Sequence, residues 1–295
     1  PVAFPLTDAG NGTYVLAETN ISPSNLDALT SGEWYLNVHT TANPNGEVRG
    51  QIVPDTTAVV TFSLSGSQEV PAVDTMAMGS GYALFDTTNN NVSLVAVTTI
   101  ENATMAHIHT GFAGENGDVL VGLVESESTA GVWMTDGSIA LDEATATQLL
   151  AGGHYVNVHT AANTGGEIRG QITPDNIEVY GIIANGLQEV PAVTTTASGA
   201  GAFTLNTSTG ALSGSVTITG MTANMAHIHE GEMGVNGDVL IGLTAGTSGM
   251  WSVPANTTLT AEQMNVMADG GLYTNFHSDA FPSGEIRGQI TLGFD

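Results

Sequence analysis

Residues 166–172 read Gly-Glu-Ile-Arg-Gly-Gln-Ile, and this stretch decides the fold because it occurs three times. The other two occurrences lie at 46–52 and 284–290, the first with Val48 in place of Ile. Apolar and polar residues alternate within the block, as they do in a half-buried strand. A strand-forming block that returns about every 120 residues predicts a tandem array of β units.

Two further motifs return with the same spacing. Gln-Glu-Val-Pro-Ala-Val at 68–73 reappears at 188–193, an offset of 120 residues. Met-Ala-His-Ile-His at 105–109 reappears at 225–229, again 120 residues later. Ordered motifs at one fixed offset predict repeated domains, each with its own core.

The repeats predict three domains. Copy 2 spans 55–174 and copy 3 spans 175–295, whereas copy 1, residues 1–54, matches only the second half of a repeat. Val-Ala-Phe-Pro-Leu at 2–6 aligns with the predicted strand Val-Leu-Val-Gly-Leu at 119–123. The first strands of copy 1, including its His-x-His, are therefore expected to be missing from this chain.

The composition favours many short strands. Hydrophobic residues make up 41% of the chain and Gly numbers 37, which suits turns between strands. Each copy carries one helix-start signal: Ser22-Pro23, Asp142-Glu143 and the capping box Thr260 to Gln263. We expect an all-β fold of tandem Greek-key or immunoglobulin-like β-sandwich repeats, each with seven or eight strands and one short helix.

The charge balance limits the partners. Twenty-nine acidic residues accompany three arginines and no lysine, and the formal net charge is −26. Such a surface repels nucleic acid and anionic lipid and attracts divalent cations. No run of 18 apolar residues occurs, so no membrane span is expected. Cysteine is absent, which excludes disulfides and thiolate chemistry.

The histidines follow the repeat. In a strand, His107 and His109 point to one face while Ile108 points to the other, and a third imidazole from a neighbouring strand could complete a metal site. His159, in Asn-Val-His-Thr, is the natural third ligand, and the same motif in copy 1 contains His39. Imidazole sets of this kind suit copper or zinc. The alternative is exposed histidines with no ligand. The predicted metal ligands are His107, His109, His159, His227, His229, His277 and His39.

Other polar residues have simpler interpretations. Glu167 and Arg169 share a strand face and predict a structural ion pair. The Gly-rich turns at 114–118 and 234–238 could hold calcium, although their spacing is also ordinary turn chemistry. His154 aligns with Trp34 and Leu272 and is expected to be a packing or surface residue.

These four motifs in this order resemble those of CHRD (chordin-type) domains: Gln-Glu-Val-Pro, Ala-His-Ile-His-x-Gly, Asn-Val-His-Thr and Gly-Glu-Ile-Arg-Gly-Gln-Ile. The resemblance covers essentially the whole chain, with copy 1 as a half domain. It implies an extracellular or cell-surface location and a binding or structural role rather than an enzyme.

A weaker likeness concerns the histidines alone. His-x-His on a Greek-key β fold is similar to the copper-ligand strand of copper–zinc superoxide dismutase, which would make His107, His109 and His159 copper ligands. The chain departs from that family because it has no bridging histidine, no second zinc-binding set and no cysteines. A dismutase-like redox enzyme is therefore the alternative function.

The expected function is a secreted structural protein that binds metal. A half domain cannot bury a good core and exposes sheet edges, so either strands from another chain complete it or the start of this sequence is a fragment boundary of a longer protein. A head-to-tail contact of that kind builds filaments, and His39 would then join a neighbour's His-x-His. A surface copper-binding protein that does not assemble is the other alternative.

Overall fold

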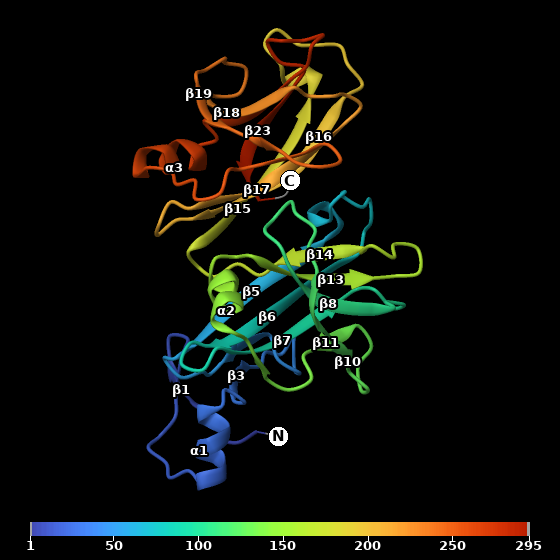
Figure 1. Ribbon diagram of the computed structural model, residues 1–295. Coiled ribbons are helices and arrows are strands. Elements are labelled where there is room, and N and C mark those ends of the chain that lie inside the picture. The colour runs from blue at the N-terminus through green and yellow to red at the C-terminus, as the bar shows by residue number, and fades with distance from the viewer. Residues whose placement is uncertain (1, 294–295) are drawn as a thin grey trace. The chain divides into compact units, whose positions relative to one another are not determined.

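The computed structural model describes residues 2–293, and the chain divides between Ala58 and Val59 into two compact units. It is an all-β structure with one short helix in each copy, as predicted (Figure 1). None of the helices among residues 2–293 is long and apolar enough to cross a membrane.

Copy 2 forms a ten-stranded antiparallel sheet in the order β10-β11-β7-β6-β5-β14-β13-β8-β9, with β12 also paired to β7. The prediction of seven or eight strands missed β10, β11 and β12, which are only two or three residues long. The bounds are β5 Thr57–Ser65, β6 Met78–Asp86, β7 Asn91–Thr98, β8 Met105–Thr110, β9 Val119–Gly122, β10 Val124–Glu125, β11 Val132–Met134, β12 Ile139–Ala140, β13 His154–His159 and β14 Ile168–Gln171.

Copy 3 repeats this sheet with nine strands in the order β19-β18-β22-β23-β15-β16-β17-β21-β20, and it is coloured yellow to red in Figure 1. The bounds are β15 Ile177–Asn185, β16 Ser198–Asn206, β17 Leu212–Thr219, β18 Met225–Glu230, β19 Val239–Gly242, β20 Thr244–Ala245, β21 Met250–Ser252, β22 Leu272–His277 and β23 Ile286–Leu292.

Each sheet curls until it is nearly closed. In copy 2, β9 and β10 are the two edges of the sheet, yet only Leu123 separates them along the chain. Trp133 of β11 and Val156 of β13 are far apart in the strand order and still share one core cluster. Both halves of the sheet therefore pack on the same interior, which gives the predicted sandwich-like fold.

Each copy has its helix where the capping signals predict it. The helices are α1 Pro23–Thr30, α2 Glu143–Leu150 and α3 Ala261–Ala268. The Asp142 carboxylate accepts a hydrogen bond from the Thr145 N–H at 2.7 Å. At α3 the capping box is complete, because Thr260 and Gln263 each bond the other's backbone N–H. These caps satisfy donors that the first helical turn leaves free.

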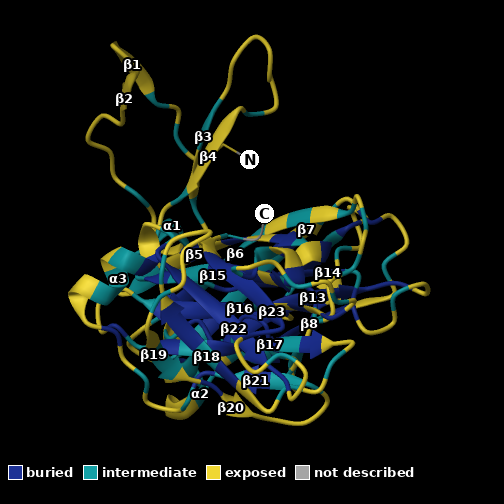
Figure 2. Ribbon diagram, turned by 90° about the horizontal axis from the view of Figure 1, so that it is seen from above, coloured by how far each residue is buried: buried dark blue, intermediate teal, exposed yellow. Residues whose placement is uncertain are grey.

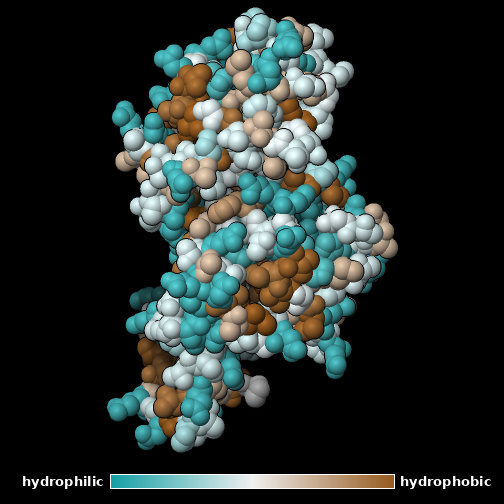
Figure 3. Space-filling view, in the orientation of Figure 1, coloured by the Kyte–Doolittle hydropathy of each residue, from teal (hydrophilic) through white to brown (hydrophobic). Residues whose placement is uncertain are grey.

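Among the described residues 2–58, the N-terminal unit has no core comparable to those of copies 2 and 3. Its elements are β1 Thr7–Gly10, β2 Thr13–Val15, α1, β3 Tyr35–Val38 and β4 Val48–Gln51. Residues 2–6, which align with the predicted strand at 119–123, do not form a strand, and among residues 2–58 no strand takes the place of β8 beside β3. The hairpin β3–β4 is largely yellow and teal in Figure 2, whereas the matching β22–β23 is blue. In Figure 3, brown apolar surface gathers over this unit in the lower part of the view.

Candidate metal centres

The pairing of β8 with β13 brings three imidazoles together on the face away from the core. Asn157 lies opposite His107, and Tyr155 lies opposite His109. Ile108 between the two histidines is only 3% exposed and belongs to the core, as its alternation predicted. His159, at the end of β13, reaches the same face. Each histidine offers one ring nitrogen, and the three nitrogens lie within 4.8 Å of one another.

Backbone carbonyls fix the rings of two of these histidines. The Nδ1 of His109 lies 3.0 Å from the Gly117 carbonyl oxygen, and the Nδ1 of His159 lies 3.1 Å from that of Thr164. A carbonyl oxygen only accepts, so each Nδ1 must carry the proton and each Nε2 must present a lone pair. This outer hydrogen bond is the arrangement that orients metal-bound histidines in proteins.

The free nitrogens converge as metal ligands do. The Nδ1 of His107 lies 3.1 Å from the Nε2 of His159. Two nitrogens at that separation, each bonded to one ion at 2.0–2.1 Å, would subtend an angle of about 100° at the metal. The Nε2 of His109 is buried and has no hydrogen-bond partner among the described residues. A buried polar atom without a partner is rare, and a metal ion would satisfy it. The residues therefore fit a bound metal.

Copy 3 builds the same cluster from His227, His229 and His277. The His227 Nδ1 lies 3.2 Å from the His277 Nε2, and the His229 Nδ1 lies 3.0 Å from the Gly237 oxygen. The His277 Nδ1 lies 3.2 Å from the Pro282 oxygen, and the His229 Nε2 is again buried without a partner among the described residues. Two copies with different surrounding residues thus reach one geometry.

The environment keeps the imidazoles in the form that binds metal. Burial lowers the pKa of His107, His109 and His159. The hydrogen bonds to Gly117 and Thr164 oppose this fall without reversing it. Neutral imidazole is the form that ligates, so these sites need not lose a proton at neutral pH.

In each copy, a buried arginine holds the loop whose carbonyl bonds one of the histidines. Tyr155 lies on β13 between β8 and β14; the His109 ring stacks on it at 5.0 Å between centroids, and the Arg169 Cζ lies 3.5 Å from its ring centre. Arg169 is 1% exposed and donates to the carbonyl oxygens of Phe112 at 2.9 Å and Glu115 at 2.7 Å. It therefore holds the loop 111–118 that supplies the Gly117 carbonyl to His109.

The predicted ion pair between Glu167 and Arg169 is wrong. Glu167 accepts hydrogen bonds from the hydroxyls of Thr75 and Thr160 instead, at 3.0 and 2.7 Å. Arg169 is held by backbone carbonyls and by the Gln171 Oε1 at 2.9 Å. Sequence alternation placed the two side chains on one face but could not reveal which loops would cover that face.

The sequence also left the Gln-Glu-Val-Pro motif without a role. Glu69 of this motif is 6% exposed, and its Oε2 accepts a hydrogen bond from the Asn157 Nδ2 at 3.2 Å. Burial raises the pKa of Glu69 to about 7, against the opposing charge of Arg169. Gln68 donates to the Ser63 oxygen at 2.9 Å and accepts from the Gln171 N–H at 3.1 Å. The motif thus connects the start of the copy to β13 and β14 by hydrogen bonds. In the sequence, its return 120 residues later was the only sign that it has a structural role.

Two histidines lie outside these clusters. His39 of copy 1 is exposed, and its Nδ1 lies 3.0 Å from the Pro44 oxygen, as in the complete sites, but residues 2–58 contain no other histidine. His154 is fully buried, which fits the predicted packing role, and burial lowers its pKa to about 4. The Gly-rich turns at 114–118 and 234–238 serve the histidines through their carbonyls, and calcium there remains a prediction.

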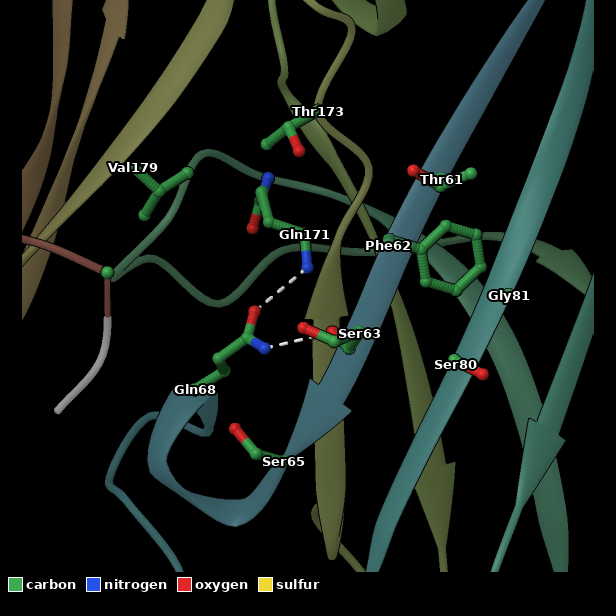
Figure 4. A pocket seen from close by; sticks show the side chains of 11 residues that line it. Thr61, Phe62, Ser63, Ser65, Gln68, Ser80, Gly81, Gln171, Thr173 and Val179 are labelled. Atoms are coloured by element: carbon green, nitrogen blue, oxygen red, sulfur yellow. Dashed lines mark hydrogen bonds between the residues drawn. The ribbon is translucent and has the colours of Figure 1, made fainter. Parts of the chain in front are cut away.

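A cavity of about 700 Å³ lies apart from the histidines, where copy 2 meets copy 3. Figure 4 shows Ser63, Ser65, Gln68 and Gln171 of copy 2 around it, together with Val179 of copy 3. Its lining mixes polar side chains with the apolar Phe62 and Val179, and the Gln68 amide in it already bonds the backbone at Ser63 and Gln171. The cavity marks the contact between the two copies and contains none of the predicted site residues.

Two curled antiparallel sheets, each with a three-imidazole cluster outside its core, define a tandem-repeat β protein with candidate metal centres. The family model of the CHRD domain matches residues 1–52, 60–172 and 180–290, so the chain belongs to the CHRD domain family. The resemblance stated from the motifs is thereby confirmed. A search of curated proteins found no significant match.

Proposed function

We propose that this protein is an extracellular binding protein whose two complete CHRD copies each hold one copper or zinc ion through three histidines. The observation that carries the proposal is the buried, unpartnered Nε2 of His109 and of His229 in the described chain, each in a cluster whose nitrogens lie within 4.8 Å. The net charge of −26 supports it, because an acidic surface concentrates divalent cations.

Metal content of the intact chain tests the proposal. The dialysed protein, loaded with Cu²⁺ or Zn²⁺ and passed through a desalting column, is expected to retain two ions per chain. The double variant His107→Ala/His109→Ala should retain one, because copy 3 serves as the matched control within the same molecule. Retention of no ion, or of two ions by the variant, would contradict it.

Copper loading adds a spectroscopic readout. Three imidazole ligands should produce nitrogen hyperfine structure in the electron paramagnetic resonance spectrum of the Cu²⁺ form. A spectrum with oxygen ligands alone would indicate surface carboxylates instead. The choice between the metals follows from competition, since divalent copper generally binds more tightly than zinc to the same nitrogen set.

We propose a binding role rather than catalysis. The motifs resemble a family of secreted binding domains, and the dismutase likeness extends only to the histidine strand. The copper-loaded chain is expected to leave superoxide decay no faster than an equal concentration of a small copper–imidazole complex. Faster turnover that the His107→Ala/His109→Ala/His227→Ala/His229→Ala variant abolishes would establish the enzyme alternative.

We also propose that the exposed sheet face of copy 1 binds a His-x-His half from another polypeptide, which would support assembly into filaments. Its sheet face shows what such a partner would cover: Tyr35 is 46% exposed and Val48 is 63% exposed. The equivalent residues of copy 2, Tyr155 and Ile168, are 2% and 0% exposed. They lie on the hairpin β13–β14, which β5 and β8 flank on its two sides. Exposed apolar faces of this kind mark interaction sites.

The third histidine site tests this completion. In assembled protein the metal content should approach three ions per chain, and His39→Ala should return it to two. Assembled protein that keeps two ions with or without His39 would rule out completion by a His-x-His strand, while leaving the sites of copies 2 and 3 untouched.

A further inference from the structure

Copy 2 contacts copy 3 through the loop 111–118. Ala113 at its tip is 1% exposed, and the Ser215 hydroxyl of β17 donates to the Gly114 carbonyl at 3.1 Å. A Cβ on Gly114 would lie 2.6 Å from the backbone carbonyl oxygen of Ser215 and 2.7 Å from the backbone nitrogen of Ala202. The contact is therefore backbone to backbone, and it depends on small residues on both sides.

The same loop of copy 3, residues 231–238, has a different character. Met233 replaces Ala113 and Val235 replaces Glu115, and these side chains are 75% and 53% exposed. A Cβ on Gly234 would meet no atom within 4 Å. An arginine holds this loop through two backbone carbonyls, as in loop 111–118, but among the described residues nothing lies against its tip.

Two more apolar residues lie on this end of copy 3. The Asn236 side chain donates to the Val190 oxygen at 2.8 Å, which holds the loop against the segment that follows the short 3-10 helix Gly186–Gln188. Leu187 in that helix is 82% exposed where copy 2 has Ser67, and Ile183 of β15 is 61% exposed where copy 2 has Ser63. We call Ile183, Leu187, Met233 and Val235 the apolar end of copy 3.

Copy 2 carries a face that matches. Tyr82 and Val95 are directly opposed on β6 and β7, at the positions of Ala202 and Ser215, which receive the loop in copy 3. Val97 on the same strand is 49% exposed, where copy 3 has Thr217. Within the chain, the small tip of loop 111–118 therefore meets small residues on β16 and β17 of copy 3. The larger, apolar tip of loop 231–238 is matched in the same way by the apolar β6–β7 face of copy 2.

We propose that the apolar end of copy 3 binds the β6–β7 face of copy 2 in a second molecule of this chain. The contact repeats between molecules the relation that loop 111–118 makes with β16 and β17 within one molecule. It joins two different surfaces, so it leaves one of each free and extends into linear assemblies. It depends neither on bound metal nor on the completion of copy 1.

Sedimentation of the full chain over a range of concentrations tests the proposal. The metal-free protein should form species larger than a dimer, and Leu187→Ser/Met233→Ser should be a monomer at the same concentrations. Met76→Ser is the control, because Met76 is 93% exposed and belongs to neither surface. A wild-type chain that stays monomeric up to about 0.1 mM would overturn the proposal.

A mixing experiment distinguishes this contact from any other. Val97→Asp disables the receiving face, and Leu187→Ser/Met233→Ser disables the apolar end, so each variant alone should be monomeric. Each retains the surface that the other lacks, and their mixture should stop at dimers. Association of the Leu187→Ser/Met233→Ser variant as strong as that of the wild type would refute this interface and leave completion of copy 1 as the cause. Unchanged thermal unfolding of each variant confirms that it is folded.

Discussion

The imidazole of His109 lies almost parallel to the phenol ring of Tyr155, with an interplanar angle of 9° and 5.0 Å between centroids. The Tyr155 hydroxyl also accepts a hydrogen bond from the Gly117 N–H at 3.2 Å, and the Gly117 carbonyl accepts one from the His109 Nδ1 at 3.0 Å. Tyr155 thus orients the His109 ring by stacking on it, and it also anchors Gly117, whose carbonyl fixes the His109 tautomer.

Tyr155→Phe should therefore weaken metal binding in copy 2. The ring stack remains, but the Gly117 peptide loses its anchor, and loss of such outer-shell partners costs about 10- to 100-fold in metal affinity. Titration with Zn²⁺ in the presence of a competing chelator should resolve one weakened and one unchanged site. Tyr273→Phe should weaken the copy 3 site instead, because Tyr273 accepts the same bond from Gly237 at 3.1 Å. Two unchanged sites in both variants would contradict the role of the hydroxyl.

Glu69→Gln should change how stability depends on pH. With its pKa raised to about 7, the folded state holds the Glu69 proton more tightly than the unfolded state, so this residue's contribution to the free energy of unfolding falls as pH rises from 4.5 to 7. The glutamine side chain is neutral throughout, and it can donate to the Asn157 Oδ1, which is buried without a partner among the described residues.

The variant should match the wild type near pH 4.5 and exceed it at pH 8 by about 1–3 kcal/mol. Urea unfolding at several pH values measures the difference. Glu69→Ala, which removes the bond to Asn157 as well, is the control and should be less stable than Glu69→Gln at every pH. Parallel pH profiles for wild type and Glu69→Gln would show that Glu69 is already ionised in the folded protein.

His154→Leu should stabilise copy 2. Both ring nitrogens of His154 are buried without partners among residues 2–293, and the equivalent residue of copy 3 is Leu272, which is 0% exposed. Removing two unsatisfied polar atoms from an apolar site is expected to raise the free energy of unfolding by about 1–3 kcal/mol. Fluorescence of Trp133 during urea unfolding, with Trp34 and Trp251 replaced by Phe, reports on this copy alone. Leu272→His is the matched reverse change and should destabilise copy 3, while neither variant should alter the number of bound metal ions.

Arg169→Lys should destabilise copy 2 by about 3 kcal/mol. Lysine cannot span the carbonyls of Phe112 and Glu115 as the guanidinium does, and it would leave a strongly hydrated charge in a buried place. Arg49→Lys in copy 1 is the comparison: Arg49 also lies 3.5 Å from a tyrosine ring centre but is exposed, so its replacement should change stability by less than about 0.5 kcal/mol. Equal effects at the two positions would mean that burial is not the reason for the cost.

The repeat made much of the candidate site predictable. His107 and His109 could be placed on one face because a strand alternates, and His159 could be added because its motif recurs with theirs. Tyr155 and Glu69 could not be assigned roles in the same way, since each acts through a neighbour far away in the sequence, and Gly117 acts through its backbone carbonyl, which no side-chain pattern reveals. The ion pair expected within residues 166–172 failed for that reason: Arg169 finds stronger partners in a loop more than 50 residues away.

The sequence alone determined the architecture: β units in tandem, a capped helix in each, and histidines at matching places in successive copies. These follow from local periodicity and from repetition, which need no knowledge of distant contacts. Only the tertiary structure decided which side chains are buried and paired. Tyr35 and Tyr155 occupy the same motif position, yet the first is 46% exposed and the second 2%, because burial depends on the strands that lie alongside and not on the residue itself.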